Sequence, residues 1–143
     1  MEPINIGELF EGPVKHVTSY RTWLFSGGWP RIEDWPAKNV HTDMEFALQC
    51  GLPTRGASAA MLQAYISELM INTFGEDWLV SGSLDLKFIQ LVKVDDQIIA
   101  KASVVKINDE GLVELDVWCE NQSSEKVCLG LGTGRVLKST VIN

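Results

Sequence analysis

The chain has few cysteines, and their placement excludes the usual cysteine-based frameworks. Cys50, Cys119 and Cys128 are odd in number and widely spaced, which predicts neither a disulfide scaffold nor a CxxC metal site. Cys119 and Cys128 fall on neighbouring predicted strands and could approach one another, but buried reduced thiols are the preferred interpretation. We therefore expect no bound metal and no resident cofactor.

Cationic side chains are also scarce, at 12 Lys and Arg against 19 Asp and Glu, for a net charge of −7. An acidic surface repels phosphate backbones, so nucleic acid is not an expected partner. No segment approaches the ~20 consecutive apolar residues that cross a bilayer, and the N-terminus lacks the basic start and apolar run of a secretory signal. We expect a cytoplasmic protein without a membrane partner. The overall charge still allows a few local Lys or Arg side chains to hold the phosphates of coenzyme A.

What is present is typical of one globular domain spanning 1–143, with 45% hydrophobic and 22% charged residues. Residues 1–13 are expected to be irregular. A short helix over 19–25, with Thr18 as its N-cap, is followed by a loop over 29–36 that is rich in tryptophan and proline. A second short helix is predicted over 44–50, with Thr42 or Asp43 as its cap.

The strongest helix signal covers 59–74, where apolar residues recur at intervals of three and four and charges are few. Ser58 is its expected N-cap, and Gly75 ends it. Beyond this helix the period changes to two, which predicts four strands in a meander, at 84–88, 98–105, 113–119 and 126–137. This order predicts an α+β fold in which an antiparallel sheet wraps around one buried helix. The sheet edges stay open, so we expect pairing with a second subunit.

The glycines of 130–134 superficially suggest a nucleotide-binding loop. They follow a strand but do not open a helix, and no GKS or GKT comes after them. We therefore interpret this segment as a strand with bulges or close backbone contacts.

Four segments together resemble one known family. The runs NVHTDMEFA (39–47) and GLPTRGASAAM (51–61) resemble the signature region of the MaoC-like hydratases and dehydratases. LKFIQLVKVDD (86–96) is similar to the strand and turn that follow in that family, and ENQ (120–122) through Gly130 is similar to its last hairpin. The resemblance extends over nearly the whole chain and implies a hot-dog fold, with a sheet wrapped around a central helix.

The family activates water on a trans-2-enoyl-CoA with an Asp and a His that have four residues between them. The resemblance implies that His41 is the catalytic His, and it places Pro36 at the position of the Asp. Proline has no proton to exchange, so the standard Asp/His pair is broken here. Asp34 and Asn39 are the nearest polar replacements: Asp34 as a carboxylate partner for His41, and Asn39 as a group that orients water or a carbonyl. A solvated loop carboxylate and a turn asparagine remain the alternative interpretations.

The family also polarises the thioester carbonyl with a backbone N–H at the start of the long helix. The resemblance places this oxyanion site at Ser58, Ala59 and Ala60, where Ala59 replaces the usual Gly. N–H groups at a helix N-terminus are well suited to stabilise an enolate oxygen. Trp78 and Phe88 are candidate walls of an acyl tunnel, although core packing explains them equally well.

Three functions remain open at this point. The first is hydration or dehydration of an acyl thioester, carried by coenzyme A or by an acyl-carrier protein, with His41 as the acid/base group. The second is a hot-dog thioesterase, for which Glu68 is the discriminating carboxylate. The third is a non-catalytic or specialised subunit, suggested by Pro36. A homodimer or higher homo-oligomer is expected, with a heterodimer of two hot-dog chains as the alternative.

Overall fold

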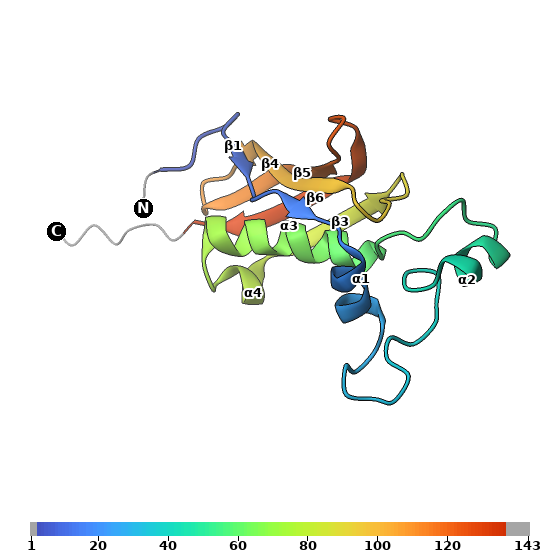
Figure 1. Cartoon of the computed structure of the whole chain (residues 1–143). Coiled ribbons are helices and arrows are strands. Elements are labelled where there is room, and N and C mark those ends of the chain that lie inside the picture. Colours follow the sequence, from blue (N-terminus) through green and yellow to red (C-terminus); the bar gives the residue numbers. More distant parts are fainter. Residues whose placement is uncertain (1–2, 137–143) are drawn as a thin grey trace.

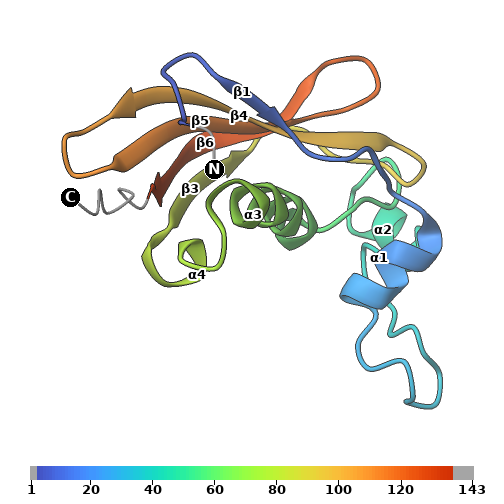
Figure 2. The ribbon, with the colours of Figure 1, turned by 90° about the vertical axis from the view of Figure 1, so that its left-hand side faces the viewer.

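An antiparallel sheet forms the larger layer of the structure. The computed structural model describes residues 3–136, and its strands lie in the order β1-β4-β5-β6-β3, with β2 paired to β4. The strands are β1 (Leu9–Glu11), β2 (Lys15–His16), β3 (Ser83–Phe88), β4 (Gln97–Ile107), β5 (Leu112–Glu120) and β6 (Lys126–Arg135). Figure 1 shows them stacked above the long helix, and Figure 2 shows the sheet curving over it.

The helix α3 (Ala59–Phe74) fills the concave side of this sheet. Its apolar face meets the inward side chains of the strands, and Ile66 and Met70 are fully buried beside Leu115 and Val117. Alternate strand residues point toward this core because successive side chains of a strand lie on opposite faces. The predicted α+β architecture, with one buried helix inside an antiparallel sheet, is confirmed.

The predicted meander is wrong in one respect. β4, β5 and β6 follow one another across the sheet, but β3 pairs with β6 at the far edge and not with β4. The alternation of residue types predicts where each strand lies in the sequence but not which strand it pairs with. The pairing of β3 with β6 in place of β4 could therefore not be predicted. The predicted last strand extended to Leu137, which lies outside the described residues.

The N-terminal part is more regular than predicted. Residues 9–11, inside the segment 1–13 that was expected to be irregular, form β1. Residues 15–16, just after it, form β2, and both strands pair with β4. Helix α1 (Ser19–Ser26) has Thr18 as its N-cap, as expected, and the Thr18 side chain accepts from the Arg21 N–H. Helix α2 (Met44–Gln49) has Asp43 as its N-cap, and the Asp43 side chain accepts from the Phe46 N–H. The short helix α4 (Trp78–Ser81) was not predicted.

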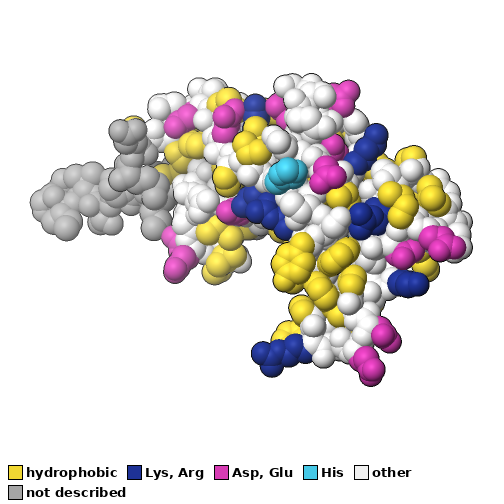
Figure 3. Space-filling model, viewed as in Figure 1, with side chains coloured by type: hydrophobic (Ala, Val, Ile, Leu, Met, Phe, Trp, Pro, Cys, Tyr) yellow, Lys and Arg dark blue, Asp and Glu magenta, His cyan; other side chains and the backbone are white. Residues whose placement is uncertain are grey.

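The segment from α1 to α2 projects away from the sheet and α3 (Figure 2). Tyr20, Trp23 and Trp35 pack there edge to face, with ring centroids 6.1 Å apart in both pairs. Figure 3 shows hydrophobic side chains gathered over α1 and below it, among mixed charges on the rest of this face. Trp35 therefore packs against α1, whereas Trp29 of the same loop is 67% exposed. None of the helices within residues 3–136 is long and apolar enough to cross a bilayer.

Gly130 and Gly134 of β6 lie where neighbouring atoms leave no room for a side chain. A Cβ on Gly130 would be 1.9 Å from the carbonyl oxygen of Asp85, and one on Gly134 would be 2.6 Å from the Phe74 ring. The prediction of a strand with close backbone contacts is therefore confirmed. Cys119 and Cys128 are directly opposed on β5 and β6 as buried free thiols, also as predicted, whereas Cys50 is exposed.

The outer face of the sheet carries a carboxylate whose titration is expected to make stability depend on pH. The Trp118 indole N–H donates to Glu120 at 2.8 Å and, with Lys101 at 3.1 Å, holds the pKa of Glu120 below its usual value of 4.5. A lowered carboxyl pKa adds stability above the unfolded value and loses it as the pH falls through the folded value.

We therefore expect Glu120→Gln to lower the free energy of unfolding at pH 7, and the gap to the unmodified chain to close in acid below the lowered pKa. Urea titrations of both proteins across that range measure this gap. A gap that stays constant with pH would show that the Glu120 charge contributes nothing. Glu110→Gln, on an exposed turn, is the matched control.

Candidate active site

The imidazole of His41 is fixed in one tautomer by the backbone. Its Nδ1 lies 2.8 Å from the carbonyl oxygen of Gly56, and a carbonyl can only accept, so Nδ1 carries the proton. The Nε2 of the neutral ring is then an unprotonated acceptor. Gly56 stands two residues before Ser58, the N-cap of α3. The structure thus places the ring at the chain segment that leads into the long helix.

The turn that carries His41 is held by Asn39 and Thr42. The Asn39 Oδ1 accepts from the His41 N–H at 2.9 Å, and its Nδ2 donates to the Ser26 carbonyl at 2.8 Å. The Thr42 hydroxyl accepts from the Asn39 N–H and donates to the Ala37 carbonyl. Asn39 therefore uses its amide to fix the turn and α1. The geometry supports its interpretation as a turn residue rather than as a group that orients water.

Replacing Asn39 should therefore destabilise the turn that carries His41 without removing an acid/base group. We expect Asn39→Ala to lower the free energy of unfolding by about 1–3 kcal/mol, because partly buried donors and acceptors lose their partners. Asn39→Asp keeps the acceptor for the His41 N–H and should lose less. Chemical denaturation of the two variants measures the difference. Equal stability of Asn39→Ala and the unmodified chain would contradict this role.

Asp34 is not brought to His41. It lies exposed, with a φ of 63°, in the loop before the Trp35–Pro36 cis peptide bond. With Trp35, Pro36 and the residues around them it lines a separate hollow of about 640 Å³. Among residues 3–136, the Gly56 carbonyl is the one hydrogen-bond partner of the His41 ring. The proposed replacement of the family carboxylate by Asp34 is therefore not supported by the geometry.

The first turn of α3 has no side-chain cap. Ser58 occupies the N-cap position, but its side chain makes no capping hydrogen bond, and its Oγ is buried without a partner among the described residues. Ser58 is therefore the N-cap residue of α3 as predicted, but its hydroxyl does not cap the helix. The first turn contains no acidic side chain either. The N–H groups of Ala59 and Ala60 are left at the positive end of a 16-residue helix, where they can donate to a developing negative charge.

An apolar groove of about 350 Å³ begins at this helix end. Its walls are Ala57, Ala59 and Leu62 on one side and the segment from Phe88 to Val92 on the other. Ala59 and Phe88, two of the expected substrate-binding residues, therefore line the same groove. His41 is not among the lining residues, and it reaches the same segment through the Gly56 carbonyl.

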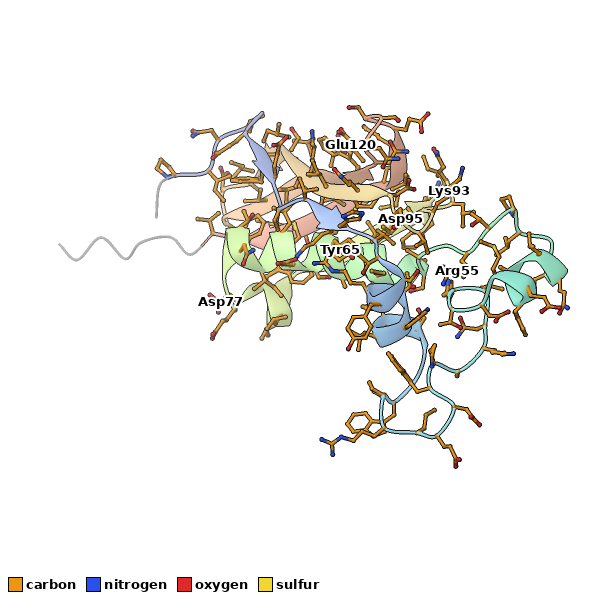
Figure 4. The ribbon with its side chains drawn as sticks, in the orientation of Figure 1. Arg55, Tyr65, Asp77, Lys93, Asp95 and Glu120 are labelled. Carbon is orange, nitrogen blue, oxygen red and sulfur yellow. The ribbon has the colours of Figure 1, made fainter. Side chains whose placement is uncertain are left out.

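Trp78 is not part of this groove. It belongs to α4, beyond the opposite end of α3, and its indole N–H donates to the Thr133 carbonyl at 3.0 Å. A helix of 16 residues is about 24 Å long, so Trp78 is far from Ser58 and Ala60. Its neighbour Asp77 is labelled at that distant end in Figure 4. Core packing against β6 explains Trp78.

Two residues of the site were not singled out from the sequence. Gly56 supplies the carbonyl that orients His41, and a Cβ there would be 2.5 Å from Leu91 Cδ1 and 2.7 Å from the Val92 carbonyl oxygen. Arg55 donates to the Ser19 hydroxyl at 3.0 Å and to the Thr42 carbonyl at 3.4 Å, so it links α1 to the His41 turn (Figure 4). A glycine shortly before a helix was the available signal for Gly56. No local signal distinguished Arg55.

Glu68 does not resemble a catalytic carboxylate. It forms an ion pair with Lys15 at 2.6 Å, and its side chain is 42% exposed. It lies ten residues after Ser58, about 15 Å along the helix from the groove. The interpretation as the polar edge of α3 fits this position. Within the described part of the chain, no three His, Cys, Asp or Glu side chains gather where they could hold a metal ion.

This fold is the α+β hot-dog fold of the MaoC-like dehydratases and (R)-hydratases. The chain is similar to the unliganded (R)-hydratase PhaJ1 of Pseudomonas aeruginosa, with a TM-score of 0.73 and 18% identity over 91% of this chain and 80% of that one. It is similar to a MaoC-like dehydratase of Rhodospirillum rubrum, with a TM-score of 0.70 and 17% identity over 94% and 96% of the two chains.

A third similar structure is the ChsH1–ChsH2 complex of Mycobacterium tuberculosis, with a TM-score of 0.69 and 16% identity over 92% of this chain and 98% of that one. No protein-family model and no curated protein matches this sequence. The predicted resemblance is therefore confirmed at the level of the fold.

Proposed function

We propose that this chain is a hydratase or dehydratase of an acyl thioester, with a trans-2-enoyl-CoA as the substrate class and His41 as its acid/base group. The observation that carries the proposal is the 2.8 Å contact between His41 Nδ1 and the Gly56 carbonyl. It leaves Nε2 as a free base beside the segment that opens α3. The hydratase and dehydratase neighbours of the fold support the same reaction class.

A single imidazole can carry both proton transfers of hydration. Nε2 takes a proton from water as the water oxygen bonds to the β-carbon of the enoyl group. The electrons of the double bond move to the thioester oxygen, where the N–H groups of Ala59 and Ala60 stabilise the enolate. The imidazolium then returns its proton to the α-carbon, and the sum is the addition of one water. Dehydration is the same path in reverse.

The acyl chain would lie in the apolar groove between Ala59 and Phe88. Coenzyme A and an acyl-carrier protein present the same thioester group, so the proposal includes substrates attached to either carrier. Neither reaction direction requires a metal or a redox cofactor from the protein. We further propose that the working unit is a homo-oligomer of at least two chains.

The test is turnover across a panel of trans-2-enoyl thioesters that differ in chain length and carrier. Hydration removes the conjugated double bond, so the absorbance of the enoyl thioester falls with time. No turnover with any member of the panel would reject the proposal. Release of free thiol without loss of the enoyl absorbance would indicate a thioesterase instead.

One observation favours a second candidate, a specialised subunit that binds an acyl thioester without turning it over. Pro36 stands at the family's Asp position, and no described carboxylate contacts His41. The ChsH1–ChsH2 neighbour is a complex of two different chains. Saturable binding of an enoyl thioester without any absorbance change, and co-purification with a second hot-dog chain, would support this candidate over the first.

A further inference from the structure

Arg55 closes a ring of contacts around the imidazole of His41. The His41 Nδ1 donates to the Gly56 carbonyl at 2.8 Å, and Gly56 directly follows Arg55 in the chain. The Arg55 guanidinium donates back, at 3.4 Å, to the carbonyl of Thr42, the residue after His41. One side chain therefore ties both partners of the His41–Gly56 hydrogen bond to each other.

The Gly56 side of this contact is fixed independently of the guanidinium. The Gly56 carbonyl and the Ala57 N–H belong to one planar peptide group. That N–H donates to the Val92 carbonyl at 2.8 Å, which sets the orientation of the plane against the outer wall of the groove. The acceptor for the imidazole is therefore held in place, and the hydrogen bond to it depends on what holds the turn that carries His41.

The same guanidinium also holds α1. It donates to the Ser19 hydroxyl at 3.0 Å, and Ser19 is the first residue of that helix. Figure 4 shows Arg55 between α1 and α2, beside the start of α3. Three segments thus meet at one planar cation: α1, the turn that carries His41, and the lead-in to α3. The fork of N–H groups on a guanidinium suits several acceptors at once, which a single ammonium does not.

The charge of Arg55 destabilises the folded chain at this position. The side chain is half-buried, and no carboxylate forms an ion pair with it among residues 3–136. Its Nε is buried and has no hydrogen-bond partner in the same range. A charge taken from water without a counter-charge and a donor without an acceptor both carry a free-energy cost. Proteins break such rules of stability chiefly at functional sites.

The other unpartnered groups lie at the same junction. Of the buried side-chain polar atoms in the described part of the chain, three lack a partner: Trp23 Nε1, Arg55 Nε and Ser58 Oγ. Trp23 is four residues after Ser19 and lies on the same face of α1. Ser58 is three residues after Arg55. Native proteins leave few buried polar groups unsatisfied, and catalytic sites are among the places where they do.

We propose that Arg55 is the positioning residue of His41 and that it acts through the fork of its guanidinium. It would orient the imidazole in a chain that has Pro36 where the family resemblance places a carboxylate. This inference rests on the proposed function, in which Nε2 must be unprotonated to accept a proton from water. Arg55 neither lines the groove nor hydrogen-bonds to the ring. It holds the turn at hydrogen-bond distance from Gly56, and a neutral ring released from that contact can carry its proton on either nitrogen.

The tautomer of His41 is the direct readout, and it needs no substrate. The chain has two histidines, so a nitrogen NMR spectrum of its imidazoles is simple, and His16→Ala identifies the signals of His41. At about pH 8.5, where an ordinary imidazole is neutral, the unmodified chain should show a protonated Nδ1 and an unprotonated Nε2. Arg55→Gln should convert this state to a mixture of both tautomers. An unchanged tautomer in Arg55→Gln would overturn the proposal.

Arg55→Lys separates the fork from the charge. It keeps the charge and most of the stem, but one ammonium cannot reach Ser19 and Thr42 together. We expect Arg55→Lys to fold, with a denaturation midpoint near that of the unmodified chain, and yet to show mixed tautomers of His41. A fixed Nδ1–H tautomer in this variant would overturn the proposal as well, because the charge alone would then orient the ring.

The kinetic signature is a split between kcat and KM. In Arg55→Gln, kcat for hydration should fall roughly 10- to 100-fold, because a misplaced base slows the chemical step. KM should stay within about twofold, since Arg55 does not line the groove. Arg21→Gln is the matched control: the Arg21 guanidinium also donates to a backbone carbonyl, that of His16 at 3.0 Å, but that carbonyl lies outside the turn. This variant should keep both the tautomer and kcat.

The role of Arg55 and the proposed function fail separately. A mixed tautomer in Arg55→Gln, with no turnover of any enoyl thioester by the unmodified chain, would reject the proposed function and leave the orienting role of Arg55 intact. A fixed tautomer and normal kcat in Arg55→Gln would reject the role of Arg55 alone. A raised KM with unchanged kcat would also overturn that role, because Arg55 would then bind the substrate and not position the base.

Discussion

Replacing His41 by alanine is expected to lower kcat/KM for hydration of an enoyl thioester by roughly two to four orders of magnitude, the usual contribution of a positioned acid/base group. The loss should be large because the Gly56 carbonyl is the one described hydrogen-bond partner of the ring. No described carboxylate contacts the ring that could take over the proton transfers of His41. A single imidazole would transfer both protons. The initial fall in enoyl absorbance measures the rate.

The matched variant is His41→Asn. Its side-chain amide can still donate toward the Gly56 carbonyl and hold the turn, but it cannot act as a base. We expect His41→Asn to be as inactive as His41→Ala while its denaturation midpoint stays closer to that of the unmodified chain. His16→Ala, on the exposed strand β2, should keep full activity.

Retention of more than about a tenth of the activity in both His41 variants would contradict the assignment, because an acid/base group contributes more than that. The oxyanion site would then account for the rate by itself. Loss of activity together with loss of the near-UV circular dichroism signal would instead indicate that the variant has not folded. The His41→Asn variant separates these two outcomes.

The fold could be predicted from local patterns because those patterns are set by burial. Apolar residues three and four apart in 59–74 must face a core, and the structure has α3 over the same residues. Alternation at 98–105 and 113–119 fixes which side chains face inward, and β4 and β5 follow it. The position of β3 beside β6 depends on pairing between distant segments. No local period encodes that pairing, so it could not be predicted.

The site was less predictable for a related reason. The family resemblance placed His41 and the start of α3, and the structure links them through Gly56. Trp78 was chosen by residue type, and Asp34 as the polar residue near Pro36 in the sequence. Trp78 lies beyond the far end of α3, and Asp34 lines another hollow without a hydrogen bond to His41, because nearness in sequence does not fix where a side chain lies. Asn39 is close to His41, but its side-chain amide is hydrogen-bonded to the backbone of His41 and of Ser26. Hydrogen bonds that satisfy loop backbones depend on tertiary contacts, which residue type alone does not reveal.

The close approach of β3 to β6 makes Gly130 the glycine with the largest expected effect on stability. A Cβ there would be 1.9 Å from the Asp85 carbonyl oxygen, which belongs to the backbone and cannot rotate away. We expect Gly130→Ala to lower the free energy of unfolding by about 3 kcal/mol or more, at the upper end of overpacking costs. That is a large part of the ~5–15 kcal/mol that keeps a domain folded.

Denaturant titration, with hydrogen exchange of the β3 amides, measures this effect. Exchange should rise at β3 before it rises at β4 and β5, because the strand must separate from β6 to admit the methyl group. Gly12→Ala is the control: its Cβ would meet atoms no closer than 3.5 Å, so stability should be nearly unchanged. Gly130→Ala as stable as Gly12→Ala would mean that β3 does not lie against β6 as described. The strand β3 would then have to be placed differently in the sheet.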